Sequence, residues 1–270
     1  MRIATWNINS IRHRLALLRR VVRALDPDIL CLQETKVEDA LFPEAACRAM
    51  GFDHLAFHGQ KAYHGVAVLS RVPIAAHEIL SWGGNGDARH LMARLGTGLE
   101  IHNVYVPAGG DEPDPETNPK FAHKLRFLDE ITAWFGARTV PKAGAVLVGD
   151  LNIAPLEHDV WSHKQLLDVV SHTPVEIARL DRLQRTQAWV DAVRHFVPAD
   201  RKLYSWWSYR ARDWAASDRG RRLDHVWVTP ALTSALVAAA AERRVRGWAR
   251  ASDHVPVWVD FAPERAGRDT

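Results

Sequence analysis

The chain has 270 residues, of which 47% are hydrophobic and 25% charged, and its formal net charge is +3. This balance is typical of a folded globular protein, and no apolar run approaches the roughly 20 residues that a membrane span needs, so we expect no membrane partner. The two cysteines, Cys31 and Cys47, show neither a disulfide-framework nor a metal-thiolate spacing. Because no secretion signal precedes the first predicted strand, we expect a cytoplasmic protein. The pI of about 9.0 is compatible with a polyanionic substrate.

Short apolar runs bounded by turn residues predict strands at 2–8, 29–32, 65–70, 74–82, 90–95, 99–106, 145–149, 222–228 and 255–261. Helical spacing of apolar residues predicts helices at 11–25, 39–50 and 120–138, and further helical and irregular structure over 156–200. Several neighbouring strands have links of hairpin length, which favours a mixed, mostly antiparallel α/β layered domain. We expect one domain over 1–262 and a polar C-terminal tail over 263–270.

Polar side chains stand at the ends of six predicted strands. These residues are Asn7 in ATWNIN, Glu34 in LCLQETK, Tyr105 in HNVYVP, Asp150 and Asn152 in VGDLNIAP, Asp224 in RRLDHVWV, and Asp253 and His254 in SDHVPV. Each motif alone is also explained by turn formation or capping, but their recurrence along the chain favours one shared site. Carboxylates and amides without thiolates suit a hard cation such as Mg²⁺ or Mn²⁺. The composition is that expected for metal-assisted phosphoester hydrolysis.

These motifs resemble the exonuclease III family of bacterial DNA-repair enzymes, which belongs to the endonuclease/exonuclease/phosphatase superfamily together with deoxyribonuclease I. The resemblance runs from residue 2 to residue 261. Two stretches fit exonuclease III more closely than the rest of the superfamily, GVAVLSR at 65–71 and YSWWSYRARDWAASDRGRRLDHVWV at 204–228. The resemblance implies a four-layer α/β sandwich of the deoxyribonuclease I type, with two mixed, mostly antiparallel sheets flanked by helices.

The resemblance also implies roles for the strand-end residues. The metal would be held mainly by Glu34, with Asn7 nearby and Asp253 as a second contact. The catalytic set would be Tyr105 as a donor to the phosphate or leaving group, Asp150 to orient or deprotonate water, Asn152 to hold the scissile phosphate, and His254 to contact it under orientation by Asp224. A histidine beside a buried aspartate stays charged, and an imidazolium stabilises negative charge that grows on phosphate.

The run SWWSYRARDWAASDRGRR interleaves aromatic and basic residues. Basic side chains neutralise phosphates, and aromatic rings stack on bases or wedge into a duplex. The predicted DNA-binding residues are Trp206, Trp207, Arg210, Trp214 and Arg219. By resemblance, Trp206 helps to form the pocket for a flipped-out abasic sugar, and flipping costs least where no base is paired. Many of the 11 tryptophans are core residues on the alternative interpretation.

The chain departs from the family pattern at two positions. Ala108 stands where many relatives carry Asn or Gln after the Y-x-P turn, so a phosphate contact is lost or is supplied by a backbone N–H of Gly109 or Gly110. Ser208 stands in WWSYR where relatives carry Asp, which affects a loop contact rather than the chemistry.

The leading prediction is a divalent-metal-dependent DNA-repair phosphodiesterase that works as a monomer on double-stranded DNA with abasic sites or 3′ ends. It would cut 5′ to abasic sites and act as a 3′–5′ exonuclease and 3′-phosphodiesterase. One alternative is a small-molecule or lipid phosphoester hydrolase of the same superfamily, which the Trp/Arg-rich loop disfavours. The other is a non-catalytic DNA-binding relative, which would have no need of Glu34 and Asp150 together.

Overall fold

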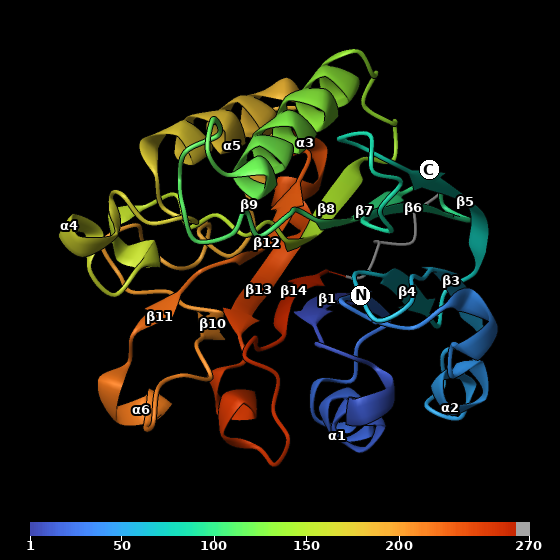
Figure 1. Cartoon of the computed structure of the whole chain (residues 1–270). Coiled ribbons are helices and arrows are strands. Elements are labelled where there is room, and N and C mark those ends of the chain that lie inside the picture. The colour runs from blue at the N-terminus through green and yellow to red at the C-terminus, as the bar shows by residue number, and fades with distance from the viewer. Residues whose placement is uncertain (263–270) are drawn as a thin grey trace.

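Two six-stranded sheets pack face to face in the computed structural model, which describes residues 1–262 (Figure 1). The first sheet has the strand order β13-β14-β1-β2-β4-β3. In that order its strands are Leu236–Ala241, Val257–Phe261, Arg2–Asn7, Ile29–Gln33, Val66–Ser70 and His54–His58. β1 and β2 run parallel, and the other neighbouring pairs run antiparallel. The polar tail expected at 263–270 lies outside the described residues.

The second sheet has the strand order β5-β6-β7-β8-β12-β9. In that order its strands are Ile74–Leu80, His90–Leu95, Glu100–Tyr105, Ala145–Asp150, Asp224–Val228 and Val190–Asp191. β7 and β8 are its one parallel pair within the described chain. A short two-stranded ribbon joins β10, Trp206–Trp207, to β11, Gly220–Arg221. The mixed, mostly antiparallel sheets expected from the short links are therefore confirmed.

Helices cover both outer faces of the paired sheets (Figure 1). α1, Leu15–Leu25, and α2, Glu44–Arg48, lie against the first sheet, whereas α3, Pro119–Gly136, and α5, Pro174–Thr186, lie against the second. The short helices α4, His163–Leu166, and α6, Trp214–Ser217, lie in the connections beside the sheets. The predicted four-layer sandwich is confirmed. Within residues 1–262, every helix is too short or too polar to cross a lipid bilayer.

Alternation along the strands explains the layers. Successive side chains of a strand point to opposite faces of its sheet. In β2, Ile29 and Cys31 enter the core between the two sheets, while Leu30 and Leu32 enter the core beneath α1. Because both faces of the central strands are covered, these strands are apolar throughout, which is why their sequences predicted them clearly.

The structure departs from the predicted elements at several places. No strand was predicted at the edge strands β3 and β13; β3 mixes polar and apolar residues, and β13 is an alanine-rich run with half-exposed side chains, a composition that is depleted in strands. The helix predicted over 39–50 is a 3₁₀ turn, Asp39–Leu41, followed by α2, because Pro43 interrupts it. The helix predicted from residue 11 begins as a 3₁₀ turn, Arg12–Arg14, and becomes α-helical only at α1.

Candidate active site

The polar residues at the strand ends meet because the inner rows of both sheets end at the same edge. β7 and β8 run parallel with Tyr105 beside Asp150, and β12 runs antiparallel to β8 with Asp224 beside Asp150. In β8, Val146 and Val148 point into the core between the sheets, and Asp150 continues that row. On the opposing sheet Asn7 ends β1 in the row that begins with Ile3. The site is thus the polar end of the inter-sheet core.

Glu34 follows β2 and connects the two sheets. Its Oε1 atom accepts hydrogen bonds from Asn7 Nδ2 at 2.8 Å and from the Tyr105 hydroxyl at 2.9 Å. Its Oε2 atom lies 2.7 Å from Lys36 Nζ. Burial would raise the pKa of Glu34, but the charge of Lys36 and the hydrogen bond from Asn7 lower it. Glu34 is therefore an ionised carboxylate at neutral pH.

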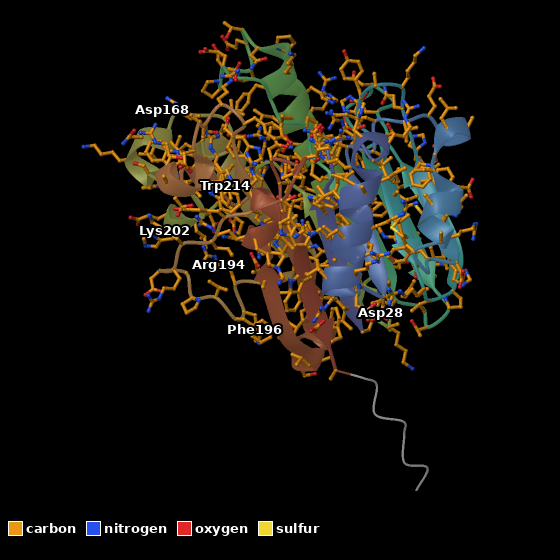
Figure 2. The ribbon with its side chains drawn as sticks, turned by 90° about the horizontal axis from the view of Figure 1, so that it is seen from below. Asp28, Asp168, Arg194, Phe196, Lys202 and Trp214 are labelled. Atoms are coloured by element: carbon orange, nitrogen blue, oxygen red, sulfur yellow. The ribbon has the colours of Figure 1, made fainter. Side chains whose placement is uncertain are left out.

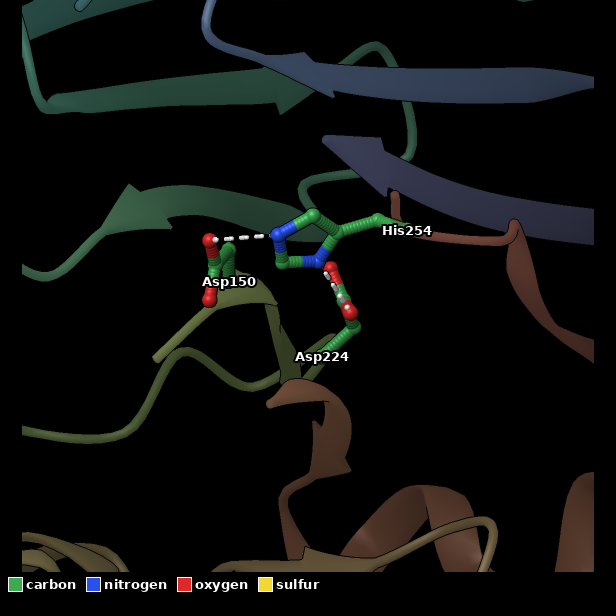
Figure 3. Close-up of side chains that lie close together, drawn as sticks. All are labelled: Asp150, Asp224 and His254. Atoms are coloured by element: carbon green, nitrogen blue, oxygen red, sulfur yellow. Dashed lines mark hydrogen bonds and ion pairs between the residues drawn. The ribbon is translucent and has the colours of Figure 1, made fainter. Parts of the chain in front are cut away.

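Asp150, His254 and Asp224 form a buried acid–histidine–acid row (Figure 3). His254 Nδ1 donates to Asp224 Oδ2 at 2.8 Å, and His254 Nε2 lies 3.6 Å from Asp150 Oδ2. Asp150 Oδ2 also accepts from Asn7 Nδ2 at 2.9 Å. Asp224 thus orients the imidazole through Nδ1, and Nε2 points toward Asp150, which lines the cleft.

The row holds its charges in an unusual state. Burial alone would lower the pKa of His254, but the charges of Asp224 and Asp150 outweigh it and raise the pKa to about 10. Burial raises the pKa of Asp150 to about 7, supported by Asp224 and opposed by His254. His254 is therefore a cation at neutral pH, and Asp150 is a carboxylate that readily exchanges a proton.

Asn152 and Tyr105 complete the catalytic set expected from the sequence. Asn152 N donates to Asp150 Oδ1 at 3.0 Å, and Asn152 Nδ2 donates to the carbonyl of Val106 at 2.9 Å. This ties the loop after β8 to the loop after β7. Burial, together with the charges of Glu34 and Asp150, raises the pKa of Tyr105 well above its usual value. Tyr105 therefore keeps its proton and acts as a donor.

A cleft of about 600 Å³ opens directly over this centre. Its floor includes Glu34, Tyr105, Asp150, Asn152 and His254. Its wall is partly apolar and partly basic, and is lined by Trp161, Leu166, Val169, Val170, Trp206, Arg210, Arg219, Arg221 and Leu223. Trp161 was missed by the sequence analysis, because it lies in the stretch 156–200, for which only helical and irregular structure was predicted. Arg221 belongs to the basic and aromatic run, but it was not among the predicted DNA-binding residues.

Asp253 is half-buried and lines the same cleft as Glu34. Its Oδ2 atom accepts from Trp206 Nε1 at 3.0 Å, and its Oδ1 atom accepts from Asn9 Nδ2 at 3.3 Å. The Arg221 guanidinium lies 5.5 Å from the centre of the Trp206 ring. Asp253 therefore fixes the orientation of Trp206 in the cleft wall, while its predicted contact with a metal stays a prediction.

Trp207, unlike Trp206, is buried. Only 1% of its surface is exposed, its ring packs against Tyr204 and Trp214, and its indole N–H donates to Asp218 at 3.0 Å. Trp206 and Trp207 are successive residues of β10 and face opposite sides, so only Trp206 reaches the cleft. In this structure Trp207 anchors the loop from the core side, and its direct contact with DNA stays a prediction.

The other predicted DNA-binding residues surround the cleft at different distances. Arg210 and Arg219 are exposed and line it, and the Arg219 guanidinium lies 4.7 Å from the centre of the Trp161 ring. Trp214 begins α6 outside the cleft lining and is stacked by Arg243 and Arg246. Figure 2 shows Asp168 and Trp214 to the upper left of Asp28 in the view from below.

The donor set fits a hard divalent cation at Glu34. Asn7 Nδ2 donates to Glu34 Oε1 and to Asp150 Oδ2, so it brings oxygen atoms of two carboxylates, the ligand type that a hard cation prefers, close to each other. A second group, Asp150, Asp224 and His254, has ligand-type atoms within 4.8 Å of one another. Because both ring nitrogens of a protonated histidine are donors, the His254 cation takes the place of a metal there.

Comparisons with known proteins agree with this geometry. Residues 4–254 match the model of the Endonuclease/Exonuclease/phosphatase family. The chain is 30% identical over 275 residues to exodeoxyribonuclease III of Haemophilus influenzae, which covers 97% of this chain and 100% of that protein. Among solved structures it is similar to an AP endonuclease from Archaeoglobus fulgidus, with a TM-score of 0.89, 30% identity and coverage of 97% and 99%. It is also similar to the 3′ phosphatase NExo from Neisseria bound to a product DNA hairpin, with a TM-score of 0.88, 30% identity and coverage of 97% and 100%.

Proposed function

The chain belongs to the endonuclease/exonuclease/phosphatase family, and from this premise we propose that it is a divalent-metal-dependent DNA-repair phosphodiesterase. It cuts double-stranded DNA on the 5′ side of abasic sites and removes nucleotides or blocking groups from 3′ ends. The observation that carries the proposal is one cleft whose floor is the acid–histidine centre and whose wall combines Trp206 with Arg210 and Arg219. The names of its relatives, an exodeoxyribonuclease, an AP endonuclease and a 3′ phosphatase, support the same substrate class.

Glu34, with Asn7 beside it, would hold a Mg²⁺ or Mn²⁺ ion. Such an ion, when bound, polarises a phosphoryl oxygen and offsets the charge that develops on it. Glu34 is suited to this because it is ionised and because its two neighbouring donors, Asn7 and Tyr105, keep its carboxylate in one orientation. Asp253, which lines the same cleft, stays a proposed second contact.

The remaining residues handle the proton and the phosphate. Asp150 takes a proton from the attacking water, an oxygen–phosphorus bond forms, and the bond to the leaving oxygen breaks. His254, held as a cation by Asp224, stabilises the negative charge on the phosphoryl oxygens, and Asn152 holds the scissile phosphate. Tyr105 keeps its proton as a donor to the phosphate or leaving oxygen. Positions and charges are set before substrate arrives, which is the condition for electrostatic catalysis.

The wall of the cleft selects the DNA. An abasic sugar without a paired base is extruded at low cost and fits against Trp206 and Trp161, while Arg210 and Arg219 meet flanking phosphates. We propose that the chain acts as a monomer in the cytoplasm, since one chain supplies the whole cleft. Trp214 contributes through α6 to the outer part of this surface.

The test uses purified protein and two labelled DNA duplexes, one with a single abasic analogue and one with a recessed 3′ end. We expect a nick 5′ to the analogue and shortening of the 3′ end, both abolished by EDTA and restored by Mg²⁺ or Mn²⁺. Asp150→Asn serves as the inactive control, because it removes the proton acceptor while keeping the shape. Cleavage that persists in EDTA would contradict the mechanism, and hydrolysis confined to small or lipid phosphoesters would replace the proposed substrate. Tight DNA binding without turnover would support the non-catalytic alternative.

A further inference from the structure

A buried ion pair lies behind the cleft, between the two helices of the outer layer. Lys124 belongs to α3 and Glu176 to the first turn of α5, and the side chains of both are 0% exposed. Lys124 Nζ donates to Glu176 Oε1. Burial lowers the pKa of Lys124, while the charge of Glu176 raises it. An ion pair at this depth is weak evidence for stability, since apolar side chains of similar volume often stabilise a core as well or better.

The remaining hydrogen bonds of Lys124 go to the two loops that form the floor of the cleft. Lys124 Nζ donates to the carbonyl of Asn152 at 2.8 Å and to the carbonyl of Ala108 at 3.2 Å. All three donors of the ammonium group are thereby used. Both acceptors are in residues that line the cleft, and Asn152 is bound to Asp150 through its backbone N–H.

Glu176 holds a third loop of the cleft. Its Oε2 atom accepts from Ser171 N at 3.0 Å, from Thr173 N at 3.2 Å and from Thr173 Oγ1 at 2.6 Å. Val170 and Ser171, at the start of this loop, line the cleft wall. The pair therefore joins three loops that are far apart in the chain at one buried point.

The loop after β7 depends on Lys124 more closely than its sequence suggests. Residue 108 is alanine, so this position carries no polar side chain, and Asp111 further along the loop is the polar side chain that lines the cleft. Gly109 has φ +93, and a Cβ atom there would lie 2.9 Å from Lys124 Cδ. The backbone thus rests directly on the lysine stem, and a side chain at 109 would separate them.

We propose that Lys124 and Glu176 are a positioning pair that sets Asn152 and the loop at 107–110 relative to the catalytic row. The inference rests on the proposed function, because it assigns the pair to the placement of the phosphate-holding groups. Neither residue lines the cleft, so each acts through the loops that it binds. An ammonium group is suited to this role because three donors at one point fix three acceptors at once.

The test compares Lys124→Met with the double variant Lys124→Met/Glu176→Gln. The single variant leaves Glu176 buried without its partner, so we expect a lower urea midpoint and a lower kcat. The double variant removes both charges, so we expect the urea midpoint to return to near the wild-type value. Its kcat on the abasic duplex should stay about 10- to 100-fold low, with little change in KM, because small misplacement of catalytic groups costs about that much. Recovery of kcat together with the midpoint would overturn the proposal.

Glu100→Gln is the matched control. Glu100 is a buried carboxylate at the opposite end of β7, paired with Arg94 and Arg138. We expect this variant to lower the urea midpoint. Its kcat should stay within about twofold of wild type, because the loss of up to about 100-fold arises only when catalytic groups are displaced. An equal loss of kcat in this variant would show that general destabilisation alone reduces turnover.

Hydrogen exchange of the DNA-free protein separates this inference from the proposed function. In the double variant, peptides over 106–111 and 150–155 should exchange faster than in wild type at equal global stability. If the wild-type protein cleaved no DNA duplex, the proposed function would be rejected. The exchange result would still test whether Lys124 and Glu176 hold the two loops in place. Unchanged exchange in both peptides would reject the positioning pair.

Discussion

Buried histidines in two regions of this fold differ in charge, because His254 is a cation and the pair His90 and His102 is neutral. His254 stands between Asp150 and Asp224 at the polar end of the inter-sheet core, and its pKa is raised to about 10. His90 and His102 lie on the outer face of the second sheet, beneath Trp134 and Phe135 of α3, and their pKa values are lowered. Burial acts in the same direction on all three rings. The neighbouring charges decide which ring is a cation.

The cluster of His90 and His102 is built to keep both rings neutral. Trp82 Nε1 donates to His90 Nδ1 at 3.0 Å, so His90 Nε2 carries the proton and donates to His102 Nδ1 at 3.1 Å. His102 Nε2 then faces Glu100 at 3.4 Å, but that carboxylate is already paired with arginines. Burial lowers the pKa of His90 most strongly, with His102 and Arg138 acting in the same direction. Of these three rings, His254 alone is therefore a cation at neutral pH.

The largest effect is expected from removing the cationic ring of the site. His254→Gln keeps a polar side chain but cannot carry the positive charge, so kcat should fall by about 100- to 1,000-fold, the usual loss for one transition-state donor. The measurement is kcat on the abasic duplex, with circular dichroism to confirm the fold. His90→Phe is the control from the neutral cluster. Because His90 is not a transition-state donor, this variant should retain kcat within about twofold of wild type. The contrast would be broken if both variants lost turnover equally.

Much of the site could be predicted because it follows from local pattern. Apolar runs located the central strands, and period-two alternation with turn residues placed Asn7, Tyr105, Asp150 and Asp224 at strand ends. That the ends would meet followed from the layered fold, since strands of both sheets end at one edge. The motif that contains Asp150 and Asn152 predicted from the sequence that this edge is acidic and polar.

Other features carry no local signal. Sequence could not tell which of Trp206 and Trp207 faces the cleft, because adjacent residues of a strand face opposite sides and both are tryptophan. Lys124 and Glu176 are 52 positions apart and look like ordinary amphipathic-helix residues until the two helices are packed. Edge strands such as β13 escape because half-exposed alanines do not distinguish a strand from a loop.

An intermediate effect is expected from Asp224→Asn, with the pKa of His254 measured in the metal-free protein and kcat measured with Mg²⁺ present. The variant keeps the shape of the side chain but removes the strongest of the charges that raise the pKa of His254, so this pKa should fall toward the usual value of about 6.5. An NMR titration of the His254 ring measures it directly. We expect kcat to fall by about tenfold or more, since a smaller fraction of the ring is then charged near neutral pH. An unaltered pKa would show that Asp150 alone holds the charge on the ring.

The smallest effect concerns stability in acid and comes from the neutral cluster. In the unfolded chain a histidine binds a proton below a pKa of about 6.5, whereas His90 in the folded protein stays neutral because its pKa is lowered. The unfolded state therefore binds more protons, and folding stability falls as the pH drops below about 6.5. At a pH one unit below that value, His90 should cost about 1.4 kcal/mol of unfolding free energy. Urea unfolding at both sides of this pH should show a shallower acid loss in His90→Phe by about that amount. If the unfolding free energy of His90→Phe fell with pH as steeply as that of wild type, the His90 ring would take up a proton in the folded protein. The difference in charge between His90 and His254 would then be smaller than their neighbouring charges predict.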